Sequence, residues 1–148
     1  AIGYNYRMSN VVAGIGRGQL LHLQEHVQRK EAIYRRYEKG LQGLPLTMNP
    51  YTDDMGPNFW LSCMLINKDC PVSPMTVMEK LKENHMEARP IWKPMHMQPV
   101  FADRDFITAA EKSVDEDIFA RGLCLPSDIK MTEEEQMSVI EVIRSCFD

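Results

Sequence analysis

The sequence of 148 residues lacks an apolar run long enough to cross a bilayer, which takes about 20 residues. Its longest apolar run, residues 59–66, contains a serine and a cysteine, and we interpret it as a buried strand. The chain also lacks an excess of positive charge, because its 17 basic residues are outnumbered by 21 acidic ones. A nucleic-acid backbone is bound by clustered lysine and arginine. Neither a membrane nor a nucleic acid is therefore an expected partner.

Paired cysteine spacings and a secretory signal are missing as well. The four cysteines, at positions 63, 70, 124 and 146, are spread along the chain, and the N-terminus has no charged segment followed by an apolar one. We therefore expect a cytoplasmic protein in a reducing environment. The length fits one domain that can bury roughly two thirds of its unfolded surface and so fold without disulfides.

The sequence has none of the common hydrolase or phosphate-binding motifs. No Gly-x-Ser-x-Gly turn occurs, no cysteine lies in a recognised catalytic context, and the glycines at 14, 16 and 18 lie in a helical stretch that follows no strand. His22 and His26 are four residues apart and could share a metal ion, but no third ligand accompanies them at a recognisable spacing. We therefore predict no metal site.

Hydrophobic periodicity and capping signals predict an α+β fold in which helices pack on a small sheet. Ser73 followed by Pro74 is a typical helix start, Thr132 with Glu135 forms a capping box, and Gly122 can end a helix. The long helix after residue 20 should bury an apolar stripe, broken once at Lys30, beneath a solvated charged face. We expect helices over residues 8–20, 20–40, 74–84 and 109–121 and from residue 132 onward, and strands over residues 44–48, 59–67, 86–91 and 122–126.

A tyrosine-rich turn, Gly3-Tyr4-Asn5-Tyr6-Arg7-Met8-Ser9-Asn10, leads into the first expected helix. Asn5 can donate its amide to a phosphate oxygen, and the guanidinium of Arg7 can hold a carboxylate or phosphate through two parallel bonds. A plain turn is the alternative, because asparagine favours left-handed turn conformations and Arg7 can simply be solvated. The chemistry alone leaves both interpretations open.

A second polar group lies in a proline-rich loop, Arg89-Pro90-Ile91-Trp92-Lys93-Pro94-Met95-His96-Met97-Gln98-Pro99. Arg89, Lys93 and His96 supply two fixed charges and a titratable donor, and Trp92 supplies an aromatic platform. Such a set suits a nucleotide diphosphate whose base or sugar stacks on the ring. The alternative is a proline-stiffened surface loop in which Trp92 and Met95 only pack.

These two segments, together with Leu123-x-Leu125-Pro126-Ser127, closely resemble the C-terminal part of the DegT/DnrJ/EryC1/StrS sugar aminotransferases. The same order continues through Ala13-x-x-Gly16-x-x-Gln19-Leu20 and Gln98-Pro99-Val100-Phe101, so the resemblance covers nearly the whole chain. It implies the C-terminal small domain of the fold-type I pyridoxal phosphate-dependent transferases, a small antiparallel sheet with helices packed on it and a long helix before it. The Trp-Lys-Pro-Met-His version looks most like enzymes that aminate UDP-linked 4-keto-6-deoxy-N-acetyl sugars.

The resemblance also implies pyridoxal phosphate as cofactor, glutamate as amino donor, a nucleotide sugar as acceptor, and a homodimer with active sites between its subunits. Asn5 matches the family position that reaches the cofactor phosphate of the neighbouring subunit. Arg7 would lie beside that site and help to hold the anionic donor or the nucleotide sugar. The residues expected to bind substrate are Arg7, Arg89, Trp92, Lys93 and His96.

In this family the lysine that holds the cofactor comes from a large N-terminal domain, before the Gly-Tyr-Asn-Tyr-Arg turn. None of the eight lysines here matches that position. We therefore expect residues 1–20 to be the last turn and helix of a missing large domain, and residues 21–148 to be the small domain. The chain is then expected to be a fragment that is inactive alone. A non-catalytic binding or oligomerisation module derived from the family is the alternative.

Overall fold

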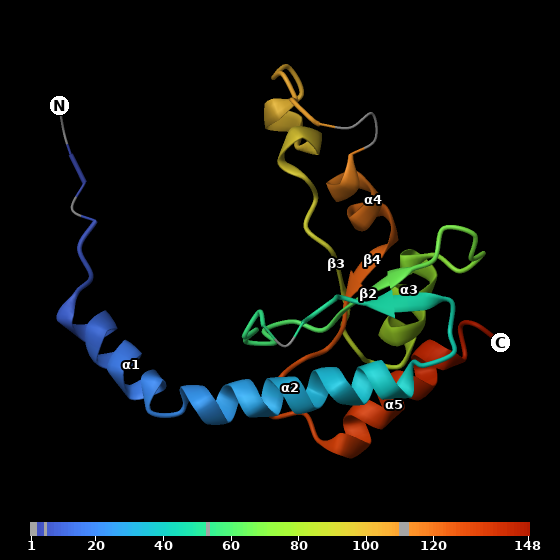
Figure 1. The fold of residues 1–148 in the computed structure, drawn as a ribbon, viewed down its shortest axis with the longest axis horizontal. Helices are drawn as coiled ribbons and strands as arrows, with labels where there is room; N and C mark the ends of the chain where they lie inside the picture. Colours follow the sequence, from blue (N-terminus) through green and yellow to red (C-terminus); the bar gives the residue numbers. More distant parts are fainter. Residues whose placement is uncertain (1–2, 5, 53, 110–112) are drawn as a thin grey trace.

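The fold is a small antiparallel sheet with helices on both faces, preceded by a helix that projects from the body (Figure 1). The computed structural model describes residues 3–4, 6–52, 54–109 and 113–148. This architecture confirms the predicted α+β class. In chain order the elements are α1 (Asn10–Leu20), α2 (Leu23–Gly40), β1 (Leu46–Met48), β2 (Cys63–Ile66), α3 (Pro74–Glu83), β3 (Arg89–Pro90), the 3-10 helices η1 (Met95–Met97) and η2 (Pro99–Phe101), α4 (Val114–Arg121), β4 (Gly122–Cys124) and α5 (Glu133–Arg144).

The sheet has the strand order β1-β2-β4-β3, and every neighbouring pair is antiparallel. β4 is the last of these strands in the sequence, yet it lies between β2 and β3. Its central residue, Leu123, is opposite Met64 on one side and Pro90 on the other. All three residues of β4 are buried, so this short strand holds the two halves of the sheet together.

One face of the sheet is covered by α2, α3 and α5, which enclose the hydrophobic core. Met64 and Leu123 point into this core from the sheet, and each is only 1% exposed. Tyr37 of α2 is fully buried there, and its hydroxyl donates to the carbonyl oxygen of Pro126 at 2.8 Å. Burial raises the pKa of Tyr37, so the phenol remains a protonated donor.

A buried glutamine joins the two long helices of the core. Gln136 of α5 is fully buried, and its Nε2 donates to the carbonyl oxygen of Ile33 in α2 at 2.8 Å. Its Oε1 accepts a hydrogen bond from Arg36, which also belongs to α2. Both polar ends of the amide are thus satisfied, as burial requires.

Side-chain caps explain where most of the helices begin. Ser73 Oγ accepts from the backbone N–H of Thr76 at 3.1 Å, which confirms the predicted start of α3. The capping box of α5 is also confirmed: Thr132 Oγ1 accepts from Glu135 N at 3.1 Å, and Glu135 Oε2 accepts from Thr132 N at 2.7 Å. Ser9 and Ser113 cap α1 and α4 in the same way.

All four predicted strands are shorter in the structure. The strands predicted over residues 44–48 and 122–126 are confined to Leu46–Met48 and Gly122–Cys124. The strand predicted over residues 59–67 begins only at Cys63. Phe59 has a left-handed backbone with φ of 50°, which an extended strand cannot contain. The strand predicted over residues 86–91 is confined to Arg89–Pro90.

The apolar stripe of α2 is buried over only part of its predicted length. Tyr34 and Tyr37 are buried, as predicted for a core stripe. Leu20 and Leu23, at the other end of the stripe, are 66% and 52% exposed. The predicted core stripe was therefore wrong for its first turns, because the sheet and α5 reach only the second half of α2 (Figure 1).

α1 extends beyond the N-terminal end of α2, away from the sheet (Figure 1). Its apolar side chains are exposed, including Val11, Val12 and Ile15. None of the described helices has the combination of length and apolarity that crossing a bilayer takes. The segment that precedes α1 is correspondingly far from the sheet.

Candidate functional site

A cavity of about 650 Å³ opens on the face of the sheet opposite the core. Its floor includes Cys124 of β4, which follows the core residue Leu123 and so points to the other face of the strand. Trp60 and Trp92 line it with ring centroids 5.9 Å apart and an interplanar angle of 34°. The two indoles are 61% and 65% exposed, so their faces are accessible to a ligand.

Trp60 was not among the predicted site residues, and a strained turn puts it in the cavity. The preceding residue, Phe59, has its positive φ while its ring packs against Tyr34 and Tyr51 at centroid distances of 5.4 and 4.7 Å. The backbone N–H of Trp60 donates to Asn58 Oδ1 at 3.0 Å, which closes the turn. The turn-forming asparagine was the sequence signal that could have separated Trp60 from the strand.

Arg89 and Lys93 line the same cavity and are both exposed. Arg89 forms an ion pair with Glu87 at 2.5 Å, and Glu87 also lines the cavity. Gln98 Nε2 donates to the carbonyl oxygen of Lys93 at 3.3 Å and so closes the loop that carries Lys93. The structure thus brings three predicted residues, Arg89, Trp92 and Lys93, into one cavity with Trp60. Two cations beside two indoles can neutralise a diphosphate and stack a planar ring.

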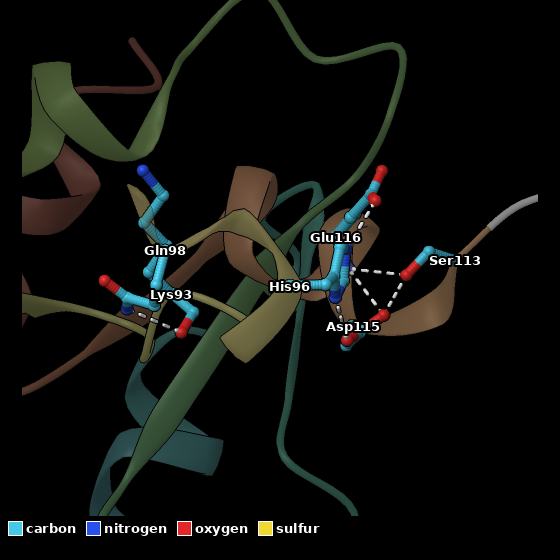
Figure 2. A network of polar contacts seen from close by, with 6 residues as sticks. All are labelled: Lys93, His96, Gln98, Ser113, Asp115 and Glu116. Atoms are coloured by element: carbon cyan, nitrogen blue, oxygen red, sulfur yellow. Dashed lines mark hydrogen bonds and ion pairs between the residues drawn. The ribbon is translucent and has the colours of Figure 1, made fainter. Parts of the chain in front are cut away.

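His96 points away from Lys93 and Gln98, toward the start of α4 (Figure 2). Its Nε2 is 2.7 Å from Glu116 Oε1, and its Nδ1 is 3.6 Å from Asp115 Oδ2. Its ring stacks on Phe106 with centroids 3.7 Å apart and an interplanar angle of 17°. Only 16% of the His96 side chain is exposed. His96 therefore ties the loop to α4 and does not line the cavity with the other three residues.

Of the two residues predicted in the N-terminal turn, Arg7 lies apart from this cavity. Asn5 is outside the described residues. Arg7 is exposed in the irregular segment before α1, where the rings of Tyr4 and Tyr6 have centroids 5.9 Å apart. Figure 1 shows this segment on the far side of α1 from the sheet. The structure therefore does not bring Arg7 together with Arg89.

The resemblance implies that a lysine holds the cofactor, so the surroundings of the described lysines matter here. Lys93 lines the cavity described above. Lys30 is the most buried described lysine, and its ammonium donates to the carbonyl oxygen of Ser127. Burial lowers the pKa of Lys30, and the carboxylate of Asp128 opposes that shift. The other described lysines are exposed.

α4 carries the acidic partners of His96, and the guanidinium of Arg121 fixes α4 to the last residue of β2. Arg121 Nη1 donates to the carbonyl oxygen of Ile66 at 2.5 Å, and its Nε donates to Asp117 Oδ1 at 3.0 Å. Lys68 Nζ lies 3.2 Å from the same carboxylate oxygen. Hydrogen bonds from Arg121, and then from Lys68, lower the pKa of Asp117 to about 2. Asp117 therefore remains ionised and holds α4 in place.

Within residues 3–4, 6–52, 54–109 and 113–148, no three His, Cys, Asp or Glu side chains are grouped closely enough to hold a metal ion. The His22 and His26 rings stack along α2 with centroids 6.1 Å apart. His22 Nδ1 lies 3.7 Å from Glu25 Oε2, its neighbour on the same helix.

Residues 1–144 match the model of the DegT/DnrJ/EryC1/StrS aminotransferase family. The chain belongs to this family. The match covers both the loop that carries Trp92 and Lys93 and the strand β4.

Similar proteins have names that refer to sugar and aminotransferase chemistry. EpsN of Bacillus subtilis, whose name describes a pyridoxal phosphate-dependent aminotransferase, is 42% identical over 99% of this chain and 38% of its own length. GDP-perosamine synthase of Vibrio cholerae is 27% identical over 99% of this chain and 40% of its own. PseC of Helicobacter pylori, an aminotransferase of pseudoaminic acid biosynthesis, shares the fold with a TM-score of 0.81 and 20% identity, over 99% of this chain and 39% of its own. The chain thus spans about two fifths of the length of these DegT/DnrJ/EryC1/StrS proteins.

Proposed function

We propose that this chain is the C-terminal portion of a pyridoxal phosphate-dependent aminotransferase that transfers an amino group from glutamate to a nucleotide-linked 4-keto-6-deoxy sugar. Residues 1–20 would belong to the large domain and residues 21–148 to the small domain of a homodimer. The observation that carries the proposal is the cavity with two indoles and two cations on a chain of this family. The name of GDP-perosamine synthase supports a nucleotide-sugar substrate.

In this proposal the cavity holds the nucleotide end of the substrate. Trp60 and Trp92 offer flat apolar faces against which a base or sugar ring can stack. Arg89 can hold a diphosphate through two parallel bonds, and Lys93 adds a mobile point charge. The partner carboxylate of Arg89, Glu87, would be displaced by the incoming phosphate oxygens.

His96 takes an indirect role in this proposal. Its contacts with Glu116 and Phe106 hold the loop that bears Trp92 and Lys93 against α4. Asn5 and Arg7 would act at the neighbouring subunit, where the resemblance directs Asn5 to the cofactor phosphate. The site is thus divided between the cavity and the N-terminal turn.

The titration of this chain with UDP tests the nucleotide cavity directly. The chain has two tryptophans, Trp60 and Trp92, and both line the cavity, so its tryptophan fluorescence reports on that cavity alone. We expect saturable quenching by UDP. Arg89→Ala should weaken the affinity about tenfold, which corresponds to the loss of roughly 1.4 kcal/mol from a charged hydrogen bond.

The matched control for this titration is Arg17→Ala, because Arg17 lies on α1 and outside the cavity. It should leave the affinity for UDP unchanged. Equal affinities in the native chain and in Arg89→Ala, or the lack of saturable quenching, would contradict the assignment of this cavity to the nucleotide.

We also propose that the chain does not transaminate by itself. The cofactor supplies the electron sink of amino transfer when it is bound, and a lysine must hold it. Since none of the lysines of this chain matches the family's cofactor-lysine position, we expect no cofactor absorbance after mixing with pyridoxal phosphate and dialysis, and no 2-oxoglutarate from glutamate. Cofactor trapped by borohydride on a single lysine would contradict this expectation.

A non-catalytic binding or oligomerisation module is a second candidate, favoured by the exposed apolar side chains of α1, such as Val11 and Ile15. Such a module would self-associate without binding a nucleotide. The UDP titration therefore separates the two proposals, provided that it is combined with sedimentation of the same samples.

A further inference from the structure

Cys63 and Cys124 face each other across two neighbouring strands. They are register partners in the antiparallel pair of β2 and β4, and their sulfur atoms are 3.6 Å apart. The Cys63 thiol donates to the sulfur of Cys124. All four cysteines of the chain are free thiols, and 61 residues separate these two in the sequence.

The backbone pattern places this pair at a position that suits a disulfide. The backbone N–H and C=O of Cys63 point away from β4, toward the segment that follows β1. The N–H donates to Oδ1 of Asn49 and the C=O accepts from the backbone N–H of Asn49, each at 2.9 Å. The next pair of facing residues, Ser62 and Leu125, is hydrogen-bonded, because Leu125 N donates to Ser62 O at 2.9 Å. Cys63 and Cys124 are therefore a non-hydrogen-bonded pair. Residues of a non-hydrogen-bonded pair have Cα atoms about 4.5 Å apart. Disulfides span Cα distances of about 4.4 to 6.8 Å, so the strands need not separate or approach.

One member of the pair, Cys124, belongs to the floor of the candidate site, and Cys63 lies beside it on β2. Cys124 lines the cavity with both tryptophans. Cys124 is also the register partner of Arg89 in β3, so Cys63, Cys124 and Arg89 form a row across three strands on one face of the sheet. A small molecule that enters the cavity can therefore reach Cys124.

We propose that Cys63 and Cys124 are a thiol–disulfide exchange site in the cavity floor, which takes low-molecular-weight disulfides and closes to an intramolecular disulfide. The Cys124 thiolate attacks one sulfur of the incoming disulfide, the S–S bond breaks, and one thiolate leaves. The Cys63 sulfur then attacks Cys124, forms the protein disulfide and displaces the second thiolate. Two protein thiols are oxidised, one external disulfide is reduced to two thiols, and the two protons from the cysteines pass to the leaving thiolates.

The electrostatics of the pair support this order of attack. The hydrogen bond from Cys63 lowers the pKa of Cys124, because it stabilises the thiolate that accepts it. The same bond, together with burial, raises the pKa of Cys63. By contrast, burial raises the pKa of Cys146, whose thiol donates to the carbonyl oxygen of Val142 in α5. Burial opposes the lowering of the Cys124 pKa. Cys124 lines the cavity and Cys63 does not, so Cys124 is the sulfur that an incoming disulfide meets first.

Closure of the disulfide would change the cavity itself. The two sulfur atoms would move from 3.6 Å to about 2.05 Å apart, directly beneath the strand that carries Arg89. A disulfide also quenches nearby indoles. Because both tryptophans line this cavity, the reaction has an optical readout that requires no ligand.

The test is to incubate the native chain with glutathione disulfide and then to alkylate and map its cysteines by mass spectrometry. We expect a cross-link between the peptides of Cys63 and Cys124, the loss of two hydrogens from the chain, and a fall in tryptophan fluorescence that dithiothreitol reverses. Adducts or cross-links confined to Cys70 and Cys146, with Cys63 and Cys124 alkylated, would overturn the proposal.

Two variants sharpen this test. The double variant Cys70→Ser/Cys146→Ser should cross-link as fully as the native chain, and failure to do so would overturn the pairing. Cys63→Ser should stop at a glutathione adduct on Cys124, whereas Cys124→Ser should accumulate less adduct. The reverse ranking would contradict the order of attack. None of these readouts depends on UDP binding, so the proposed function and this site can fail separately.

Discussion

Replacing Tyr37 by alanine should lower the free energy of unfolding by about 3 to 5 kcal/mol, the range for large aromatic truncations in cores. The Tyr37 ring is fully buried between α2, the sheet and α5, so its removal leaves a cavity that neighbouring side chains cannot fill. The substitution also removes the hydroxyl that bonds Pro126 O, in the segment that follows β4. Urea unfolding followed by circular dichroism measures the loss.

Two variants separate the causes of this effect. Tyr37→Phe keeps the ring and deletes only the hydroxyl, so it should cost about 1 to 3 kcal/mol through the unsatisfied carbonyl of Pro126. Tyr6→Ala is the control, because Tyr6 is 91% exposed and its loss should change stability by no more than about 0.5 kcal/mol. A Tyr37→Ala variant as stable as Tyr6→Ala would show that the core does not depend on this ring.

Gly122→Ala should also destabilise the fold, by about 3 kcal/mol, at the upper end for overpacking. A Cβ at residue 122 would lie 2.4 Å from Ile91 Cγ1 and 2.5 Å from the carbonyl oxygen of Ile118 in α4. The carbonyl oxygen cannot move without shifting α4, and Ile91 lines the cavity. The variant should therefore lose both stability in urea and affinity for UDP.

The matched control is Gly14→Ala on the exposed surface of α1, where an added Cβ meets nothing within 4 Å. Alanine is favoured over glycine inside a helix by about 1 kcal/mol, so this variant should be neutral or slightly more stable. Equal stability of the two variants would mean that α4 does not rest against Gly122.

Local signals made the helix boundaries predictable, and Gly122 shows where such signals stop. The caps at Ser73 and Thr132 depend on residues three positions apart, so they were visible in the sequence. Gly122 does follow the end of α4, as predicted. Its φ of −97° is open to any residue, however, so glycine is required by the close approach of Ile91 and α4 and not by a left-handed turn.

The composition of the cavity was predictable only where its residues are close in the sequence. Only Pro90 and Ile91 separate Arg89 from Trp92 and Lys93, so these three meet because the loop is short. Trp60 joins them from a segment more than twenty residues earlier, through the positive φ of Phe59, for which the only local signal was the preceding turn-forming asparagine. His96 was grouped with them by its position in the loop. Its acidic partners in α4 lie about twenty residues later, so no local pattern indicated that His96 points toward them.

The place of β4 between β2 and β3 has a consequence during synthesis. As the polypeptide leaves the ribosome, the segments that become β2 and β3 emerge long before residues 122–124 and cannot pair with each other, since the native sheet separates them by β4. Pairings between segments distant in the sequence form slowly, because the intervening loop must close first. We therefore expect nascent chains that end before residue 122 to remain unfolded and protease-sensitive, and protection to appear only once β4 has emerged from the exit tunnel.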